Sequence, residues 1–261
     1  MSIVVPAVLP SSRKDFQEKL DFFAQISSVN RIQIDVVDGR FATPASWPYF
    51  AKATQGTPYF AKATQGTPYF AKATQGTPYP ELEAMVKKGE MLPRLDRIEY
   101  EIDLMCNDAE LAAVAWLALG AMRFTFHVES TSDLPRLLAS ARRRYGDDSI
   151  VSFGLALNIA SDLALIEQHI NTIQYVQFMG ISRIGRQGQP FDERVFEKVR
   201  VFHNRHPHIP VQVDGGISLE SAKKLLSLGV STLIIGSSIL KAGDPAAAIA
   251  AFEALSTPYG V

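Results

Sequence analysis

Hydrophobic positions along the chain follow two alternating periods. Short runs rich in β-branched residues are separated by longer stretches in which apolar residues recur with helical spacing. The short runs are Ile3–Leu9, Arg31–Val37, Ile98–Met105, Arg123–Val128, Ile150–Leu157, Thr172–Phe178, Pro210–Val213 and Thr232–Ile235. A strand followed by a helix, repeated eight times in this way, predicts an α/β fold in which a parallel sheet closes into a (β/α)₈ TIM barrel. We therefore predict a single barrel domain over residues 1–261.

Start signals precede several of the predicted helices. Ser and Asp side chains accept hydrogen bonds from the free amides of a first helical turn. Residues in such positions are Ser12, Ser161, Ser218 and Asp244, the last followed by Pro245 at a position where a missing amide does no harm. In the sixth predicted helix, one face carries the apolar residues Val195, Phe196, Val199 and Phe202. We expect this face to pack against the barrel wall.

Residues 48–80 interrupt the alternation, in the loop after the second predicted strand. Here the decamer AKATQGTPYF occurs three times from Ala51, with Pro80 replacing the last Phe. Thr-Pro can start a helix and Gly can end one, so each copy can form a short helix. Such helices need their aromatic side chains packed on the barrel or on another subunit of a homo-oligomer. The alternative is a mobile polar loop, which like the helices would stand beside the barrel mouth.

Composition narrows the range of partners. Of 261 residues, 47% are hydrophobic, which is enough for one sizeable core. With 26 basic and 27 acidic residues, the chain has no basic field to attract nucleic acid or a membrane surface. The single cysteine, Cys106, excludes an internal disulfide framework and a thiolate zinc cluster. We found no secretory signal and no long apolar run, so we expect a cytoplasmic protein.

Polar residues gather at the predicted strand ends. In a parallel barrel these ends meet at one rim, so residues distant in sequence are expected to converge there. The residues concerned are Gln33, Asp35, Asp103, His127, Glu129, Asn158 and Asp214. Singly, each carboxylate could cap a loop or pair with an arginine. Several buried together are costly without a cation or a shared proton, which favours a functional role.

Glycine-rich turns supply a second candidate feature. Asp214-Gly215-Gly216 follows the seventh strand and Gly236-Ser237-Ser238 the eighth, where backbone amides of barrels commonly bind phosphate. The loop after the sixth strand contains Gly185, Gly188 and Gln189 and could fold over the same anion. Its Arg183 and Arg186 either add charge to that site or remain solvated.

These motifs together resemble the ribulose-phosphate 3-epimerase family. The resemblance rests on an ordered set that spans roughly residues 3–255, interrupted by the decamers. Its members are QIDVVDGRF at 33–41, YEIDLM at 100–105, FHVE at 126–129, GLALN at 154–158, the Gly185–Phe191 loop, VDGGI at 213–217 and Gly236-Ser237. The set is far more specific than any single glycine pair.

The resemblance implies proton transfer at a carbon next to a carbonyl, with Asp35 and Asp214 as the acid/base pair. It also implies a divalent metal held by Asp35, Asp214 and two histidines, but this chain has Gln33 and Asp103 at the histidine positions. An all-oxygen set would favour Mg²⁺ or Mn²⁺. Ala7 likewise stands where the family usually places a substrate-binding serine.

Two functions therefore remain open. The leading one is an isomerase, a sugar-phosphate epimerase, whose partner is a small phosphorylated ketose held by Gly185, Gly188, Gln189, Gly215, Gly216, Gly236 and Ser237. The alternative is a noncatalytic barrel that binds a phosphorylated ligand and uses the repeat insert for assembly or partner contact. Two other features are interpreted as structural: the surface histidines His203, His206 and His208, and Cys106, which has no evident partner base.

Overall fold

The computed structural model describes residues 2–49, 79–145 and 150–256. Its strands are β1 (Val4–Val8), β2 (Arg31–Val37), β3 (Glu99–Met105), β4 (Arg123–His127), β5 (Ser152–Leu157), β6 (Tyr175–Met179), β7 (Val211–Asp214) and β8 (Thr232–Ile235). Each strand pairs in parallel with the next, and β8 pairs with β1 to close the barrel. The predicted (β/α)₈ barrel is confirmed.

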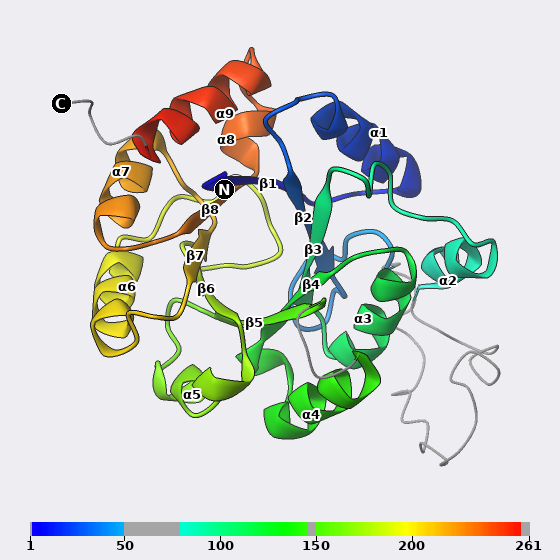
Figure 1. Ribbon diagram of the computed structural model, residues 1–261, viewed down its shortest axis with the longest axis horizontal. Helices are drawn as coiled ribbons and strands as arrows, with labels where there is room; N and C mark the ends of the chain where they lie inside the picture. The colour runs from blue at the N-terminus through cyan, green and yellow to red at the C-terminus, as the bar shows by residue number, and fades with distance from the viewer. Residues whose placement is uncertain (1, 50–78, 146–149, 257–261) are drawn as a thin grey trace.

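Helices surround this barrel on its outside (Figure 1). They are α1 (Arg13–Ala24), α2 (Pro80–Lys87), α3 (Ala109–Ala118), α4 (Leu134–Tyr145), α5 (Ala164–Glu167), α6 (Arg194–Arg205), α7 (Leu219–Ser227), α8 (Ser237–Leu240) and α9 (Pro245–Glu253). Short 3₁₀ turns lie at Val128–Ser130, Ile170–Thr172 and Ala254–Ser256. Within the described ranges, no helix combines the length and the hydrophobicity that a bilayer crossing requires.

Local sequence signals account for most helix starts. Ser12, Ser218 and Asp244 each accept a hydrogen bond from a first-turn amide, as predicted. The prediction for Ser161 is wrong, because α5 begins only at Ala164. There the carboxylate of Asp162 accepts a hydrogen bond from the Ala164 amide at 2.8 Å. Asp162, rather than Ser161, therefore bonds a free amide at the start of this helix.

The strand boundaries differ most at β5 and β6. Ile150 was expected to begin a strand, but it is 68% exposed and β5 starts at Ser152. Thr172 is predicted to begin the next strand, but it lies in a 3₁₀ turn, where its own amide donates to His169 O at 2.8 Å. β-Branched residues at both sites favour a strand locally. Strand pairing nevertheless begins only where the barrel register brings neighbouring backbones together.

Apolar side chains fill the layer between strands and helices. The face predicted for α6 is buried, since Val195, Val199 and Phe202 have no exposed surface. On the other side of the barrel, Phe16 of α1 stacks on Trp47 with ring centroids 4.5 Å apart. The outer layer therefore supplies the hydrophobic core.

The barrel interior, by contrast, carries polar side chains at matching levels. The register of β2 and β3 pairs Gln33 with Glu101 and Asp35 with Asp103. All four side chains are buried. Residue register thus produces two polar layers, an upper one near the strand ends and a lower one two residues deeper.

Most of the decamer repeats, at residues 51–78, lies outside the described residues. The last copy ends at Pro80, which is the first residue of α2 and occupies the position that proline tolerates best. The expectations for the insert, helical or mobile, remain predictions.

Candidate active site

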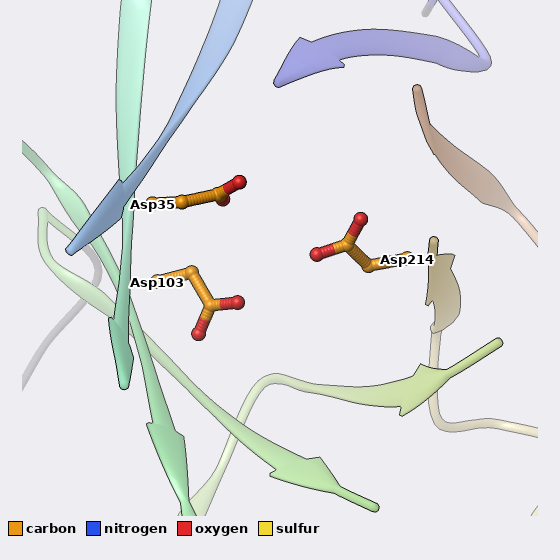
Figure 2. Close-up of side chains that lie close together, drawn as sticks. All are labelled: Asp35, Asp103 and Asp214. Atoms are coloured by element: carbon orange, nitrogen blue, oxygen red, sulfur yellow. The ribbon is translucent and has the colours of Figure 1, made fainter. Parts of the chain in front are cut away.

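Three aspartates from three strands meet inside the barrel mouth. Asp35 and Asp103 come from the adjacent strands β2 and β3, and Asp214 faces them from the end of β7 (Figure 2). One carboxylate oxygen of each lies within 4.8 Å of the others, and all three side chains are buried. Among the described residues, no Lys or Arg side chain forms an ion pair with them. The convergence predicted from the strand ends is therefore present.

Side-chain amides and one histidine contact most of these carboxylate oxygens. Gln33 Nε2 donates to Asp35 Oδ1 at 2.9 Å and to Asp214 Oδ2 at 3.1 Å, so one amide bridges two strands. Asp103 Oδ1 lies 3.0 Å from His127 Nε2, and Asp103 Oδ2 accepts from Gln177 Nε2 at 3.0 Å. No motif indicated Gln177, although its alternation with the apolar residues of β6 is a signal for an inward position.

Burial of so much acid changes its protonation. Burial, followed by the nearby charge of Asp103, raises the pKa of Asp35 to about 8. Burial, followed by the charge of Asp35, holds the pKa of Asp214 well above its usual range. Two neighbouring carboxyls with raised pKa values share protons, so one acid and one base can coexist near neutral pH.

The lower polar layer is organised around one further acid. Glu101 is fully buried, and its Oε2 accepts from Arg123 Nε at 3.1 Å and lies 3.9 Å from Arg31 Nη1. Its Oε1 accepts from Thr125 Oγ1 and from Gln212 Nε2. Two cations therefore compensate the charge of Glu101, in a network that no sequence motif predicted.

A glycine leaves room for an aromatic ring in this layer. A Cβ on Gly154 would lie 2.1 Å from the ring of Tyr175 on the adjacent strand β6. The Tyr175 hydroxyl lies 2.9 Å from Thr125 Oγ1, and Arg123 stacks on its ring at 4.1 Å from the centroid. Glycine at this position thus lets an aromatic ring enter the barrel beside the buried charges.

Two of the three aspartates share one pocket with the glycine turns. The same cavity is lined by Asp35 and Asp214 and by all seven residues proposed for phosphate binding, Gly185, Gly188, Gln189, Gly215, Gly216, Gly236 and Ser237. Gly216 has φ of +70°, and a Cβ there would lie 2.8 Å from the Phe191 backbone. Only glycine allows the turn after β7 to approach the β6 loop this closely.

A cation that the sequence analysis overlooked lies at the glycine end. Lys241 follows α8 and lines an opening with Gly188, Gln189, Gly216, Ser237 and Ser238. A Cβ on Gly188 would lie 3.2 Å from Lys241 Nζ. Because the side chain follows a helix rather than a strand end, no motif pointed to it.

Two other candidates, Glu129 and Asn158, do not line this pocket, and Arg186 borders it. Glu129 Oε1 accepts from the Asn158 amide at 2.9 Å, and Asn158 lines a separate cleft with Arg183. Arg186 borders both cavities, and its Nε donates to Thr43 O at 2.9 Å. The convergence expected of the strand ends therefore does not extend to Glu129 and Asn158.

The residues interpreted as structural are placed away from the mouth or deep in the core. His206 follows the C-terminal end of α6, where its ring lies 3.2 Å from Glu167 Oε1. Burial, followed by the charge of Asp108, raises the pKa of the Cys106 thiol, so the thiol remains protonated.

Comparison with known proteins decides the family. The model of the ribulose-phosphate 3 epimerase family matches residues 82–240, more than half of the chain. The chain belongs to the ribulose-phosphate 3-epimerase family. The matched segment contains Asp103, Asp214 and the glycine turns, while Asp35 precedes it.

Individual epimerase relatives are distant. The cytoplasmic isoform of ribulose-phosphate 3-epimerase from Oryza sativa is 30% identical over 134 residues, covering 51% of this chain and 58% of the rice protein. Ribulose-phosphate 3-epimerase from Mycobacterium leprae is 24% identical over 257 residues, covering 96% of this chain and 93% of that protein. The match to the rice epimerase thus spans little more than half its length.

The barrel also resembles solved structures at low sequence identity. KGPDC from Streptococcus mutans superimposes with a TM-score of 0.59 at 16% identity, covering 98% of this chain and 97% of that one. This likeness supports the barrel fold of the epimerase family member described here.

Proposed function

We propose that this chain is a sugar-phosphate epimerase that inverts one carbon next to the carbonyl of a phosphorylated ketose. The supporting observation is that one pocket contains both Asp35 and Asp214 and the three glycine-bearing loops. An anion held at the loops would place the ketose chain across the aspartates. Family membership makes ribulose 5-phosphate the first substrate to test.

The two aspartates divide the proton transfer between them. The ionised carboxylate removes the proton from the substrate carbon. The electron pair of the broken C–H bond stays with the substrate and becomes part of an enediolate. The protonated carboxyl on the other side then donates its proton to the opposite face of that carbon. The raised pKa values of Asp35 and Asp214 suit this pairing, because general acid–base catalysis works best when pKa values lie near the working pH.

The donor set suits a hard divalent cation. Three buried carboxylates within 4.8 Å, with no Lys or Arg ion pair among the described residues, form an oxygen site of the kind that Mg²⁺ or Mn²⁺ prefers. We therefore assign Asp35, Asp103 and Asp214 as the residues that would hold the ion. Once bound, such an ion supplies positive charge that stabilises the negative charge developing on the substrate oxygens.

Gln33 fits the metal less well than the three aspartates do. Its amide NH₂ group faces Asp35 and Asp214, while its Oε1 is buried without a hydrogen-bond partner. The amide would have to turn over for its oxygen to join the ligands. As placed, Gln33 holds the two acid/base carboxyls in a fixed relation, which is the role that we propose for it.

The orientation of Gln33 also favours the second candidate function, a noncatalytic barrel that binds a phosphorylated ligand. In that case the amide would substitute for a cation, and the glycine loops would bind the anion without chemistry following. The repeats, which would provide the contact surface in this alternative, lie outside the described residues.

A turnover assay separates the two functions. We expect the protein to convert ribulose 5-phosphate to its epimer when Mg²⁺ or Mn²⁺ is supplied, with Zn²⁺ and Fe²⁺ tested in parallel. Absence of turnover with every metal, in a protein that still binds the sugar phosphate, would reject the epimerase and leave the binding function.

A further inference from the structure

Gln187 places a polar group between the two ends of the pocket. It belongs to the loop after β6, and its Nε2 donates to Ala7 O near the end of β1 at 3.3 Å. A Cβ on Gly236 would lie 2.7 Å from the same nitrogen. The Gln187 amide therefore reaches across the mouth and packs against the turn after β8.

Much of the hydrogen-bonding capacity of Gln187 is left for a ligand. A glutamine amide offers one acceptor oxygen and two N–H donors. In the described part of the chain, the hydrogen bond to Ala7 O uses one of those donors, and no hydrogen bond is formed by Oε1. The residue is half-buried and lines the pocket, so these groups are within reach of a ligand bound there.

The other uncharged polar side chains of this pocket, Gln189, Ser237 and Ser238, also border the opening beside Lys241 at the glycine end. Ala7, Met179 and Ile234 line the same pocket with apolar side chains. Ala7, whose carbonyl Gln187 contacts, is paired with Gln33, and Gln33 in turn bonds Asp35 and Asp214. Gly236, the other neighbour of the Gln187 amide, belongs to one of the glycine turns. A ligand extending from the aspartates to the turns must pass the Gln187 amide.

We propose that Gln187 binds the hydroxyl group that lies between the reacting carbon and the phosphate of the ketose, and so determines substrate specificity. This inference rests on the proposed function and deepens it. In ribulose 5-phosphate, that group is the 4-hydroxyl. An analogue that lacks it cannot form this hydrogen bond, and sites that bind a substrate hydroxyl discriminate against analogues without one.

The test compares two ligands with two proteins. Ribulose 5-phosphate and its 4-deoxy analogue are titrated calorimetrically into the wild-type chain and into Gln187→Leu, which keeps the side-chain size but removes the amide. We expect the wild type to bind the 4-deoxy analogue about 10-fold more weakly, a typical effect of losing one hydrogen bond. In Gln187→Leu, the two ligands should bind within about twofold of each other.

Gln189→Leu is the matched control. Gln189 lies two positions further along the same loop and lines the glycine end of the pocket. Its replacement should weaken both ligands by the same factor and keep the wild-type preference. Circular dichroism and the melting temperature of each variant show whether the barrel remains folded.

Binding makes this inference independent of turnover. A wild type that binds the sugar phosphate with the expected preference but turns over nothing would reject the epimerase and keep the role of Gln187. Equal affinity of the wild type for both ligands, or the same preference in Gln187→Leu, would overturn the inference. It would also fall if the wild type bound neither ligand at millimolar concentration.

Discussion

The barrel interior contains two layers of buried acid that differ in how their charge is balanced. In the lower layer, Glu101 has Arg123 and Arg31 beside it, together with two neutral donors. In the upper layer, Asp35, Asp103 and Asp214 have glutamine and histidine partners and no Lys or Arg ion pair among the described residues. The lower layer is complete in itself, whereas the upper one requires protons or an external cation.

The contrast separates a structural network from a chemical one. A buried ion pair with full hydrogen bonding holds the barrel strands in register and has nothing left to offer a substrate. Uncompensated carboxyls raise their pKa values, and strongly perturbed groups in a cleft are typical of functional sites. If the two layers differ as their contacts indicate, substitutions in the upper layer change catalysis and substitutions in the lower layer change stability.

The largest expected effect concerns catalysis. Asp214→Asn removes one of the two proton-transfer groups and should lower kcat about 10³-fold, a size typical of general acid–base groups. Turnover of ribulose 5-phosphate with saturating Mn²⁺ measures it. The control in the lower layer is Glu101→Gln, which should keep kcat within about threefold because Glu101 does not line the pocket. Equal losses in the two variants would erase the distinction between the layers.

The second largest expected effect is on the free energy of unfolding, through the lower layer. Arg123→Met leaves Glu101 buried with Arg31 at 3.9 Å as its remaining cation, and should reduce the free energy of unfolding by roughly 3–5 kcal/mol. Urea denaturation measures the change. The double variant Arg123→Met with Glu101→Met should recover most of the loss, because no unpaired charge remains. A loss under about 1 kcal/mol in the single variant would mean that water compensates the glutamate.

A third prediction concerns pH and metal in the upper layer. The folded-state pKa of Asp35, raised to about 8, exceeds its unfolded value, so the folded protein binds more protons between these two values. Without metal, the free energy of unfolding should therefore be highest in mild acid and fall by roughly 3 kcal/mol as the pH rises from 5 to 8.

Chemical denaturation at each pH, in a chelating buffer, measures this slope. Asp35→Asn should flatten it, and Mg²⁺ or Mn²⁺ should restore stability at pH 8 by binding the ionised carboxylates. A metal-free wild type with constant stability from pH 5 to 8 would contradict the assignment of uncompensated charge.

The smallest expected effect lies at the glycine end of the pocket. Lys241→Met removes a cation from beside Gly188 and should raise KM for ribulose 5-phosphate about 10-fold with kcat nearly unchanged, because Lys241 is remote from the aspartates. Lys241→Arg should retain most of the affinity. Inorganic phosphate as a competitive inhibitor should weaken in parallel, and an unchanged inhibition constant would show that Lys241 does not contact the anion.

Local sequence patterns were sufficient for the barrel and for part of its mouth. The alternation of apolar runs identified all eight strands, and the strand-end positions of Asp35, Asp103 and Asp214 predicted their convergence. Both inferences succeed because parallel strands bring their carboxyl ends to one rim, whatever the details of packing. The ordered motifs pointed in the same way to the family that the comparison then established.

The tertiary structure decided which polar groups meet and which cations balance them. Gln212 contacts Glu101 and Gln187 reaches Ala7 only because the barrel closes with a particular register between strands distant in sequence. The position of Lys241 beside Gly188 depends on how a loop and a helix end pack. Hydrophobic periodicity records which face of a strand is buried, but it contains no information about the partner across the barrel.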